Sequence, residues 1–157
     1  MNDLITKLTE VFATNFVAYY RSHVAHVNIT GRNFYSDHKL LKKVYVNQQA
    51  NIDTLAEFLR TLDTFMPECL LDVQDLSAIS DHMVAGDSDE LLRLVCEDLE
   101  TLVELYRELE TEAESAGQDQ IANYAQEQLT ILTKQIWMIN STIGAAQPQD
   151  ELDDYDD

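Results

Sequence analysis

Glycine, proline and cysteine are scarce in this chain. It has 157 residues but only four glycines and two prolines, too few for a fold built from many short strands and turns. The two cysteines, Cys69 and Cys96, lie far apart and form no metal-binding or redox motif. No apolar run approaches the roughly 20 residues that a membrane span needs, and the N-terminus does not resemble a signal segment. These absences favour one helical domain in a reducing, cytoplasmic compartment, with no membrane partner.

Positive charge is also scarce, and it is unevenly distributed. Residues 1–60 carry seven Lys and Arg against five Asp and Glu, whereas residues 61–157 carry three against 24. The resulting net charge of −19 repels phosphate backbones, so we expect no direct binding to DNA unless divalent ions bridge the two. Metal cations are the partners that such a surface favours.

The apolar residues recur at spacings of three and four along four stretches of the chain, which is typical of amphipathic helices. We expect a helix at residues 3–28, and a second that follows an N-cap at Ser36 or Asp37 and ends near residue 62. A third should run from an N-cap at Asp87 or Ser88 to about Ser115. The fourth should cover residues 120–142, with Gly144 just beyond its end.

The connections between these helices complete the topology. Turns at residues 28–33 and 116–119 join the helices into two hairpins, and a crossover at residues 63–88 joins the hairpins. Pro67 interrupts the crossover, and a short helix is expected in it at residues 72–83. This pattern predicts an all-α, ferritin-like four-helix bundle with a short helix in its long crossover. The domain should cover residues 1–146, followed by an acidic, disordered tail at 147–157.

A di-iron site inside such a bundle requires Glu-x-x-His motifs on two helices. The chain contains no Glu-x-x-His, and its third and fourth predicted helices contain no histidine. A di-iron centre enclosed by one bundle is therefore disfavoured.

Four other residues have the chemistry of metal ligands. His26 and His38 flank the first turn, and Asp53 and Glu57 lie one helical turn apart on the second helix. Asp53 is 15 residues beyond His38, which corresponds to roughly 22 Å along a helix. One chain therefore cannot bring all four to one metal. Two second helices packed antiparallel about a two-fold axis could do so, and would create two identical sites.

Simpler interpretations of these residues remain open. The histidines could be surface or capping residues, and the acidic pair could be solvated. His23, one turn before His26, could supply a replacement nitrogen ligand or could lie at an interface. Iron and zinc both suit histidine and carboxylate ligands, so the residue types do not decide between them.

The spacing of these residues resembles that of the Dps mini-ferritins. The similarity also includes an Asp-x-x-Ala-Glu pattern, an Ile-Trp-Met run in the fourth helix and the turn at Gly117, and it covers residues 4–144. It implies a homododecameric cage with ferroxidase sites at its two-fold interfaces. These would oxidise Fe(II), preferentially with hydrogen peroxide, store ferric iron and protect against oxidative damage. The matching positions are His26, Asn28, Gly31, Phe34, His38, Asp53 and Glu57.

By this resemblance, His26 and His38 are ligands from one subunit, and Asp53 and Glu57 are ligands from its partner. Family members usually carry Asp four residues after the second histidine, where this chain has Lys42. Lys42 would repel Fe(II) or pair with Glu57, unless it points to solvent, and a non-catalytic cage with a degenerate metal site is the alternative.

The resemblance has two further consequences. Glu114 and Asp119 flank the turn where family cages place their iron-entry pores, although the deeper pore acid is replaced by Asn123. The residue after the first histidine, commonly Trp, is Val27.

Overall fold

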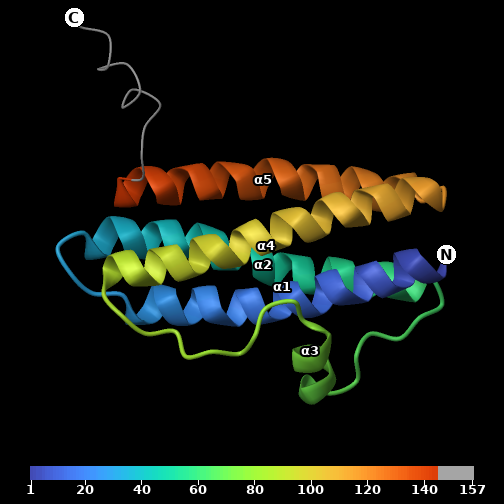
Figure 1. Cartoon of the computed structure of the whole chain (residues 1–157), viewed down its shortest axis with the longest axis horizontal. Coiled ribbons are helices and arrows are strands. Elements are labelled where there is room, and N and C mark those ends of the chain that lie inside the picture. Colours follow the sequence, from blue (N-terminus) through green and yellow to red (C-terminus); the bar gives the residue numbers. More distant parts are fainter. Residues whose placement is uncertain (145–157) are drawn as a thin grey trace, which may run out of the picture.

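The computed structural model describes residues 1–144, and the predicted acidic tail at 147–157 lies outside this range. Within it the chain forms five helices and no strand (Figure 1). None of these helices is long and apolar enough to cross a membrane. The helices are α1 (Asn2–Asn28), α2 (Phe34–Thr61), α3 (Leu70–Leu76), α4 (Ser88–Ser115) and α5 (Asp119–Ile143).

The four long helices form a bundle of two hairpins, which confirms the predicted all-α, ferritin-like architecture. α1 packs along α2, α4 packs along α5, and α1 also packs against α4. The crossover returns along the length of the bundle and brings the start of α4 beside the α1–α2 turn (Figure 1). A Cβ added to Gly31 in that turn would lie 3.8 Å from Ser88 Oγ. The turn between the two candidate histidines thus lies against the start of α4.

The core is built from apolar side chains at helical spacing. On α4 alone, Leu92, Leu99, Leu102, Tyr106 and Leu109 are almost completely buried. Successive members of this set are three, four or seven residues apart, as expected for one face of an amphipathic helix.

Buried polar contacts fix how α1 and α2 lie against each other. Asn15 Nδ2 donates to the backbone carbonyl of Gln48 at 2.9 Å, and Ser22 Oγ donates to Gln48 Oε1 at 2.6 Å. Since all three residues are buried, a shift of one helix along the other would leave polar atoms without partners. The two helices that carry the candidate ligands therefore have one defined register.

The helix starts follow the sequence prediction in α4 but not in α2. Asp87 is the N-cap of α4 and forms a capping box with Glu90, through backbone-to-carboxylate bonds of 2.9 and 2.7 Å. The N-cap of α2 is Asn33, so the prediction of Ser36 or Asp37 was wrong. The first helical bond already runs from Asp37 N–H to Asn33 O, which places both predicted caps inside the first turn.

The short crossover helix is also placed differently from the prediction. α3 covers Leu70–Leu76 rather than residues 72–83. Ser77 adopts an extended backbone after α3, and its hydroxyl exchanges hydrogen bonds with the backbone N–H and carbonyl of Ile79. Such local serine bonds compete with helical ones and end the helix early.

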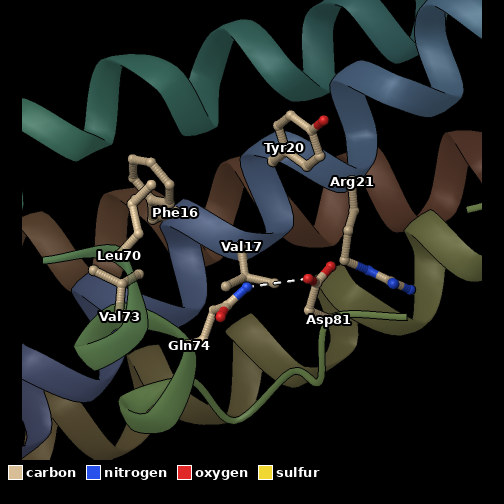
Figure 2. A pocket seen from close by; sticks show the side chains of 8 residues that line it. All are labelled: Phe16, Val17, Tyr20, Arg21, Leu70, Val73, Gln74 and Asp81. Atoms are coloured by element: carbon tan, nitrogen blue, oxygen red, sulfur yellow. Dashed lines mark hydrogen bonds between the residues drawn. The ribbon is translucent and has the colours of Figure 1, made fainter. Parts of the chain in front are cut away.

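α3 packs against α1 and leaves a shallow pocket between them (Figure 2). Phe16, Val17, Tyr20 and Val73 form much of its wall. Gln74 Nε2 donates to Asp81 at 3.0 Å and connects α3 to the chain that follows it.

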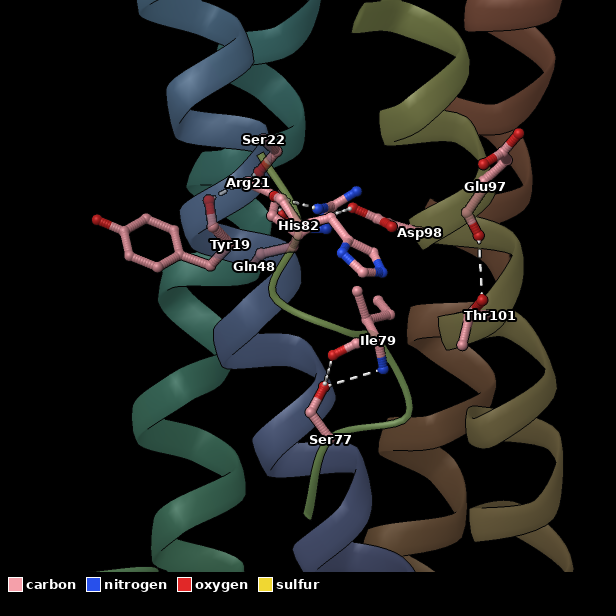
Figure 3. Close-up of polar contacts among 10 residues, drawn as sticks. All are labelled: Tyr19, Arg21, Ser22, Gln48, Ser77, Ile79, His82, Glu97, Asp98 and Thr101. Carbon is pink, nitrogen blue, oxygen red and sulfur yellow. Dashed lines mark hydrogen bonds and ion pairs between the residues drawn. The ribbon is translucent and has the colours of Figure 1, made fainter. Parts of the chain in front are cut away.

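A buried ion pair attaches the crossover to the bundle. Arg21 Nε on α1 donates to Asp98 on α4 at 2.6 Å, and Arg21 Nη1 donates to the His82 carbonyl at 2.9 Å (Figure 3). His82, to which the sequence assigns no role, takes part through its backbone. Burial raises the pKa of Asp98, and the Arg21 guanidinium opposes that rise. Arg21 thus holds three segments of the chain together.

Candidate metal centre

The first turn brings His26 and His38 together at one end of the bundle. His26 lies in the last turn of α1 and His38 in the first turns of α2. Their rings stack with centroids 3.7 Å apart and planes at 17°. Phe34 covers the His38 ring at 5.0 Å between centroids. Two residues that are twelve apart in the sequence therefore form one imidazole pair.

Reciprocal hydrogen bonds orient both rings. His26 Nδ1 lies 2.7 Å from the His38 carbonyl, and His38 Nδ1 lies 2.7 Å from the His26 carbonyl. A carbonyl can only accept, so each Nδ1 carries the proton. When the rings are neutral, the lone pair of each Nε2 is free to bind a metal, as in metal-ligating histidines whose other nitrogen donates to a carbonyl. The turn thus prepares two nitrogen ligands.

The surroundings of His26 favour its neutral form. His26 is only 7% exposed, and burial lowers the pKa of its ring below the ordinary histidine value. The hydrogen bond to His38 opposes this shift, whereas the charges of His38, His23 and Lys42 add to it. The neutral ring is the form that binds a metal.

The acidic pair lies elsewhere on the same helix. Asp53 and Glu57 are exposed side chains one turn apart on α2, which is one uninterrupted helix from Phe34 to Thr61. At 1.5 Å per residue, Asp53 is roughly 22 Å along the axis from His38. Nowhere in residues 1–144 do three His, Cys, Asp or Glu side chains gather closely enough to hold a metal ion. The structure brings the two histidines together and keeps the two acids apart from them.

Lys42 is exposed and lies one helical turn after His38. Burial is the main cause of the lowered pKa of His26, and the positive charge of Lys42 is the smallest of the contributions that lower it. The same charge acts against a cation at the imidazole pair.

His23 and two tyrosines extend the site along α1 and α2. The His23 ring lies 6.1 Å from that of His26, and its Nδ1 shares a 3.2 Å hydrogen bond with the Tyr19 hydroxyl. Tyr45 stacks on His23 with centroids 4.2 Å apart and also lies 4.9 Å from His26. Sequence reasoning missed both tyrosines. Their spacing could have revealed them. Tyr19 is four residues before His23 on α1, and Tyr45 is seven residues after His38 on α2, so each tyrosine lies on the same helix face as that histidine.

The two predicted pore residues lie at the opposite hairpin. Glu114 and Asp119 are exposed and flank the α4–α5 turn, in which Gly117 has a φ of 68°. Both carboxylates are therefore accessible in the single chain, and their role in a pore stays a prediction.

Comparison with protein families identifies the class of this protein. The family model for the ferritin-like domain matches residues 5–147. The chain therefore belongs to the ferritin-like family.

Individual relatives narrow this class. The chain is 27% identical over 138 residues to the DNA protection during starvation protein of Helicobacter pylori, covering 87% of this chain and 96% of the relative. Antigen TpF1 from Treponema pallidum has a similar structure, with a TM-score of 0.84, 27% identity and coverage of 90% and 92%. Dps from Thermosynechococcus elongatus, at 18% identity, shares the fold with a TM-score of 0.87 over 94% and 93% of the two chains. Within the ferritin-like family, this chain is thus similar in sequence to a DNA protection during starvation (Dps) protein and similar in fold to Dps structures.

Proposed function

We propose that this protein is a mini-ferritin that binds and oxidises Fe(II) at sites shared between two copies of the chain. Family membership supports an iron-related function in general. The observation that carries the specific proposal is the placement of candidate ligands on α2. His38 lies near one end of that helix, beside His26, and Asp53 and Glu57 lie near the other.

Antiparallel packing of two α2 helices would bring the opposite ends together. His26 and His38 of one chain would then face the partner subunit's Asp53 and Glu57, and the two-fold axis would repeat the site. Two neutral imidazoles and two carboxylates suit Fe(II) as a substrate. The anionic oxygens favour the more highly charged Fe(III) product, which assists oxidation. Zinc fits the same ligands and would compete for them.

The wider proposal is a homododecameric cage that stores the ferric product. Hydrogen peroxide is the proposed oxidant, so the cage would remove Fe(II) and peroxide together and limit oxidative damage. The net charge of −19 per chain supports accumulation of cations. Glu114 and Asp119, both exposed at the α4–α5 turn, are the proposed iron-entry acids.

Fe(II) titration of the purified protein tests this function. We expect the ferric absorbance after addition of hydrogen peroxide to rise faster than in buffer, and faster than after aeration alone. Native mass analysis should give a dodecamer that retains iron. Assembled protein that oxidises iron no faster than buffer would contradict the catalytic proposal.

Lys42 supports a second candidate function, a cage with a degenerate, non-catalytic metal site. Its charge already acts on His26 in the metal-free chain. We therefore expect Lys42→Asp to increase Fe(II) affinity and the oxidation rate by about tenfold or more, since the change removes a nearby cation and adds an oxygen ligand. The measurement is the initial ferric absorbance rate at limiting Fe(II).

Lys43→Asp is the matched control. It makes the same change in charge at the next residue, on the side of α2 that faces Lys134 and Gln135 of α5. An equal gain in both variants would attribute the effect to net charge rather than to the site. If wild type is inactive and Lys42→Asp is active, the degenerate site is the better description.

A further inference from the structure

The surface between α2 and α5 is basic, in a chain that is otherwise strongly acidic. Residues 38–52 of α2 include three lysines and no acidic residue, and residues 128–143 of α5 include one lysine and no acidic residue. Lys43 and Lys134 are exposed and line the same groove between the two helices. Within residues 1–144 neither ammonium forms an ion pair. Two positive charges therefore face solvent here, although the whole chain carries a net −19.

The groove also has apolar walls and an unused hydrogen-bond acceptor. Its volume is about 280 Å³, and its apolar part is formed by Leu40, Ile131 and Met138. Gln135, which is only 7% exposed, donates from Nε2 to the Lys43 carbonyl at 3.3 Å. Its Oε1 is buried and has no hydrogen-bond partner in the described part of the chain, which is a costly state for a polar atom. The groove therefore offers positive charge, apolar surface and a place for an N–H donor.

A peptide that carries acidic residues satisfies these three requirements together. Its carboxylates pair with the lysines, a backbone N–H donates to the Gln135 oxygen, and an apolar side chain covers the apolar walls. A small anion supplies charge alone and leaves those walls in contact with water. The chain itself contains such a peptide directly after α5. Residues 145–157, here called the acidic segment, include six Asp and Glu, one Leu and one Tyr.

The acidic segment is long enough to reach the groove from the end of α5. Met138 and Ile131 are 6 and 13 residues before Gly144, which corresponds to roughly 9 and 20 Å along the helix. Six residues can span up to about 20 Å, so Asp150 and the residues after it have access to the whole groove. The end of α5 also lies at the same end of the bundle as the α1–α2 turn, where α2 begins (Figure 1).

We propose that the acidic segment binds in the α2–α5 groove of its own chain, with carboxylates of residues 150–154 on Lys43 and Lys134. Exposed ion pairs are individually weak. The segment is tethered beside the groove, however, which gives it an effective concentration on the order of millimolar. Its binding closes this basic surface to other anions. The inference goes beyond the proposed iron chemistry and does not depend on it, because none of the candidate metal ligands takes part.

Zero-length carbodiimide cross-linking of the full chain tests the contact. The reagent joins an amine to a carboxylate only where the two groups touch. We expect peptide mass analysis to find Lys43 or Lys134 joined to residues 150–157, in protein that still runs as one chain after denaturation. Lys7, whose ammonium lies 2.6 Å from Glu10, is the internal control and should be joined to that residue instead. In 1 M salt, where the screening length is about 3 Å, the links to the groove should fall several-fold.

Hydrogen exchange of the assembled protein provides a second measurement. Backbone amides of residues 145–157 should exchange several-fold faster in Lys43→Gln with Lys134→Gln than in wild type, because the segment loses its binding site. Lys42→Gln with Lys7→Gln is the matched control. It removes the same charge at two positions outside the groove, so exchange should equal that of wild type. All four lysines are on the surface or partly exposed, so these variants should retain the fold.

Each outcome decides for or against the proposal. Links within one chain, together with faster exchange in the groove variant alone, support it. Links found only between two chains place a second copy's segment in the groove and overturn it. Links spread equally over Lys7, Lys42 and the groove lysines indicate attraction without a binding site, and they overturn it as well. Equal exchange in wild type and the groove variant also overturns it. None of these measurements uses iron, so failure of the ferroxidase proposal would leave this one standing.

Discussion

His38→Ala and Glu57→Gln chains should each fail to oxidise Fe(II), and a mixture of the two should regain activity when they assemble together. The His38→Ala chain retains both acids, and the Glu57→Gln chain retains both histidines. A mixed dimer then has one intact site and one site that lacks both residues. Random pairing of equal amounts should restore about one quarter of the wild-type sites. The measurement is the ferric absorbance rate after joint refolding.

A second mixture provides the control. It combines His26→Ala chains with His38→Ala chains. These cannot form an intact site in any pairing, because both substitutions remove a histidine ligand. Their mixture should stay inactive. If the first mixture is no more active than its components, or if Glu57→Gln alone is fully active, the site does not lie between two chains.

Asp98→Asn should lower the free energy of unfolding by about 3–5 kcal/mol, the cost of leaving one member of a buried ion pair without its partner. Arg21 is only 5% exposed, so its guanidinium could not regain water without rearrangement of the bundle. The raised pKa of Asp98 indicates that burial outweighs the attraction of Arg21. Taking both charges out of water offsets most of their attraction, so an intact buried pair adds little net stability, whereas the loss of one partner is costly. Urea unfolding at a fixed protein concentration measures the effect.

Two comparisons make the result interpretable. Arg21→Met with Asp98→Leu removes both charges and should cost much less than Asp98→Asn alone. Glu104→Gln breaks the exposed pair with Arg107, at 2.8 Å, and should change stability by at most about 1 kcal/mol. If Asp98→Asn costs no more than Glu104→Gln, the buried pair does not hold the crossover in place.

Local patterns accounted for most of the secondary structure. The apolar spacing predicted four long helices, and the bounds of α1, α4 and α5 agree within one residue. The wrong predictions were the start of α2 and the bounds of α3, where a local hydrogen bond decides where the helix begins or ends. α2 begins earlier, because its first helical bond starts at Asn33, and α3 ends at Leu76, because Ser77 bonds locally to Ile79.

The candidate site was only partly accessible to sequence reasoning. Helix rise alone predicted that Asp53 lies too far along α2 to join His38, and α2 is indeed continuous between them. The reciprocal hydrogen bonds, in which each histidine Nδ1–H donates to the carbonyl of the other histidine, were not predictable. They depend on how the α1–α2 turn closes. The stacking of Tyr45 on His23 also requires a particular register between the two helices.

The sequence by itself determined the helices, the hairpins and the distance between the histidines and the acids. These depend on the 3.6-residue repeat and on the rise per residue, which are properties of neighbouring residues. Only the tertiary structure decided the orientation of the imidazole pair, the hydrogen bond between Tyr19 and His23, and the Arg21–Asp98 pair across 77 residues. These contacts join side chains from different helices, and packing around Gln48 sets the register on which the contacts between α1 and α2 depend.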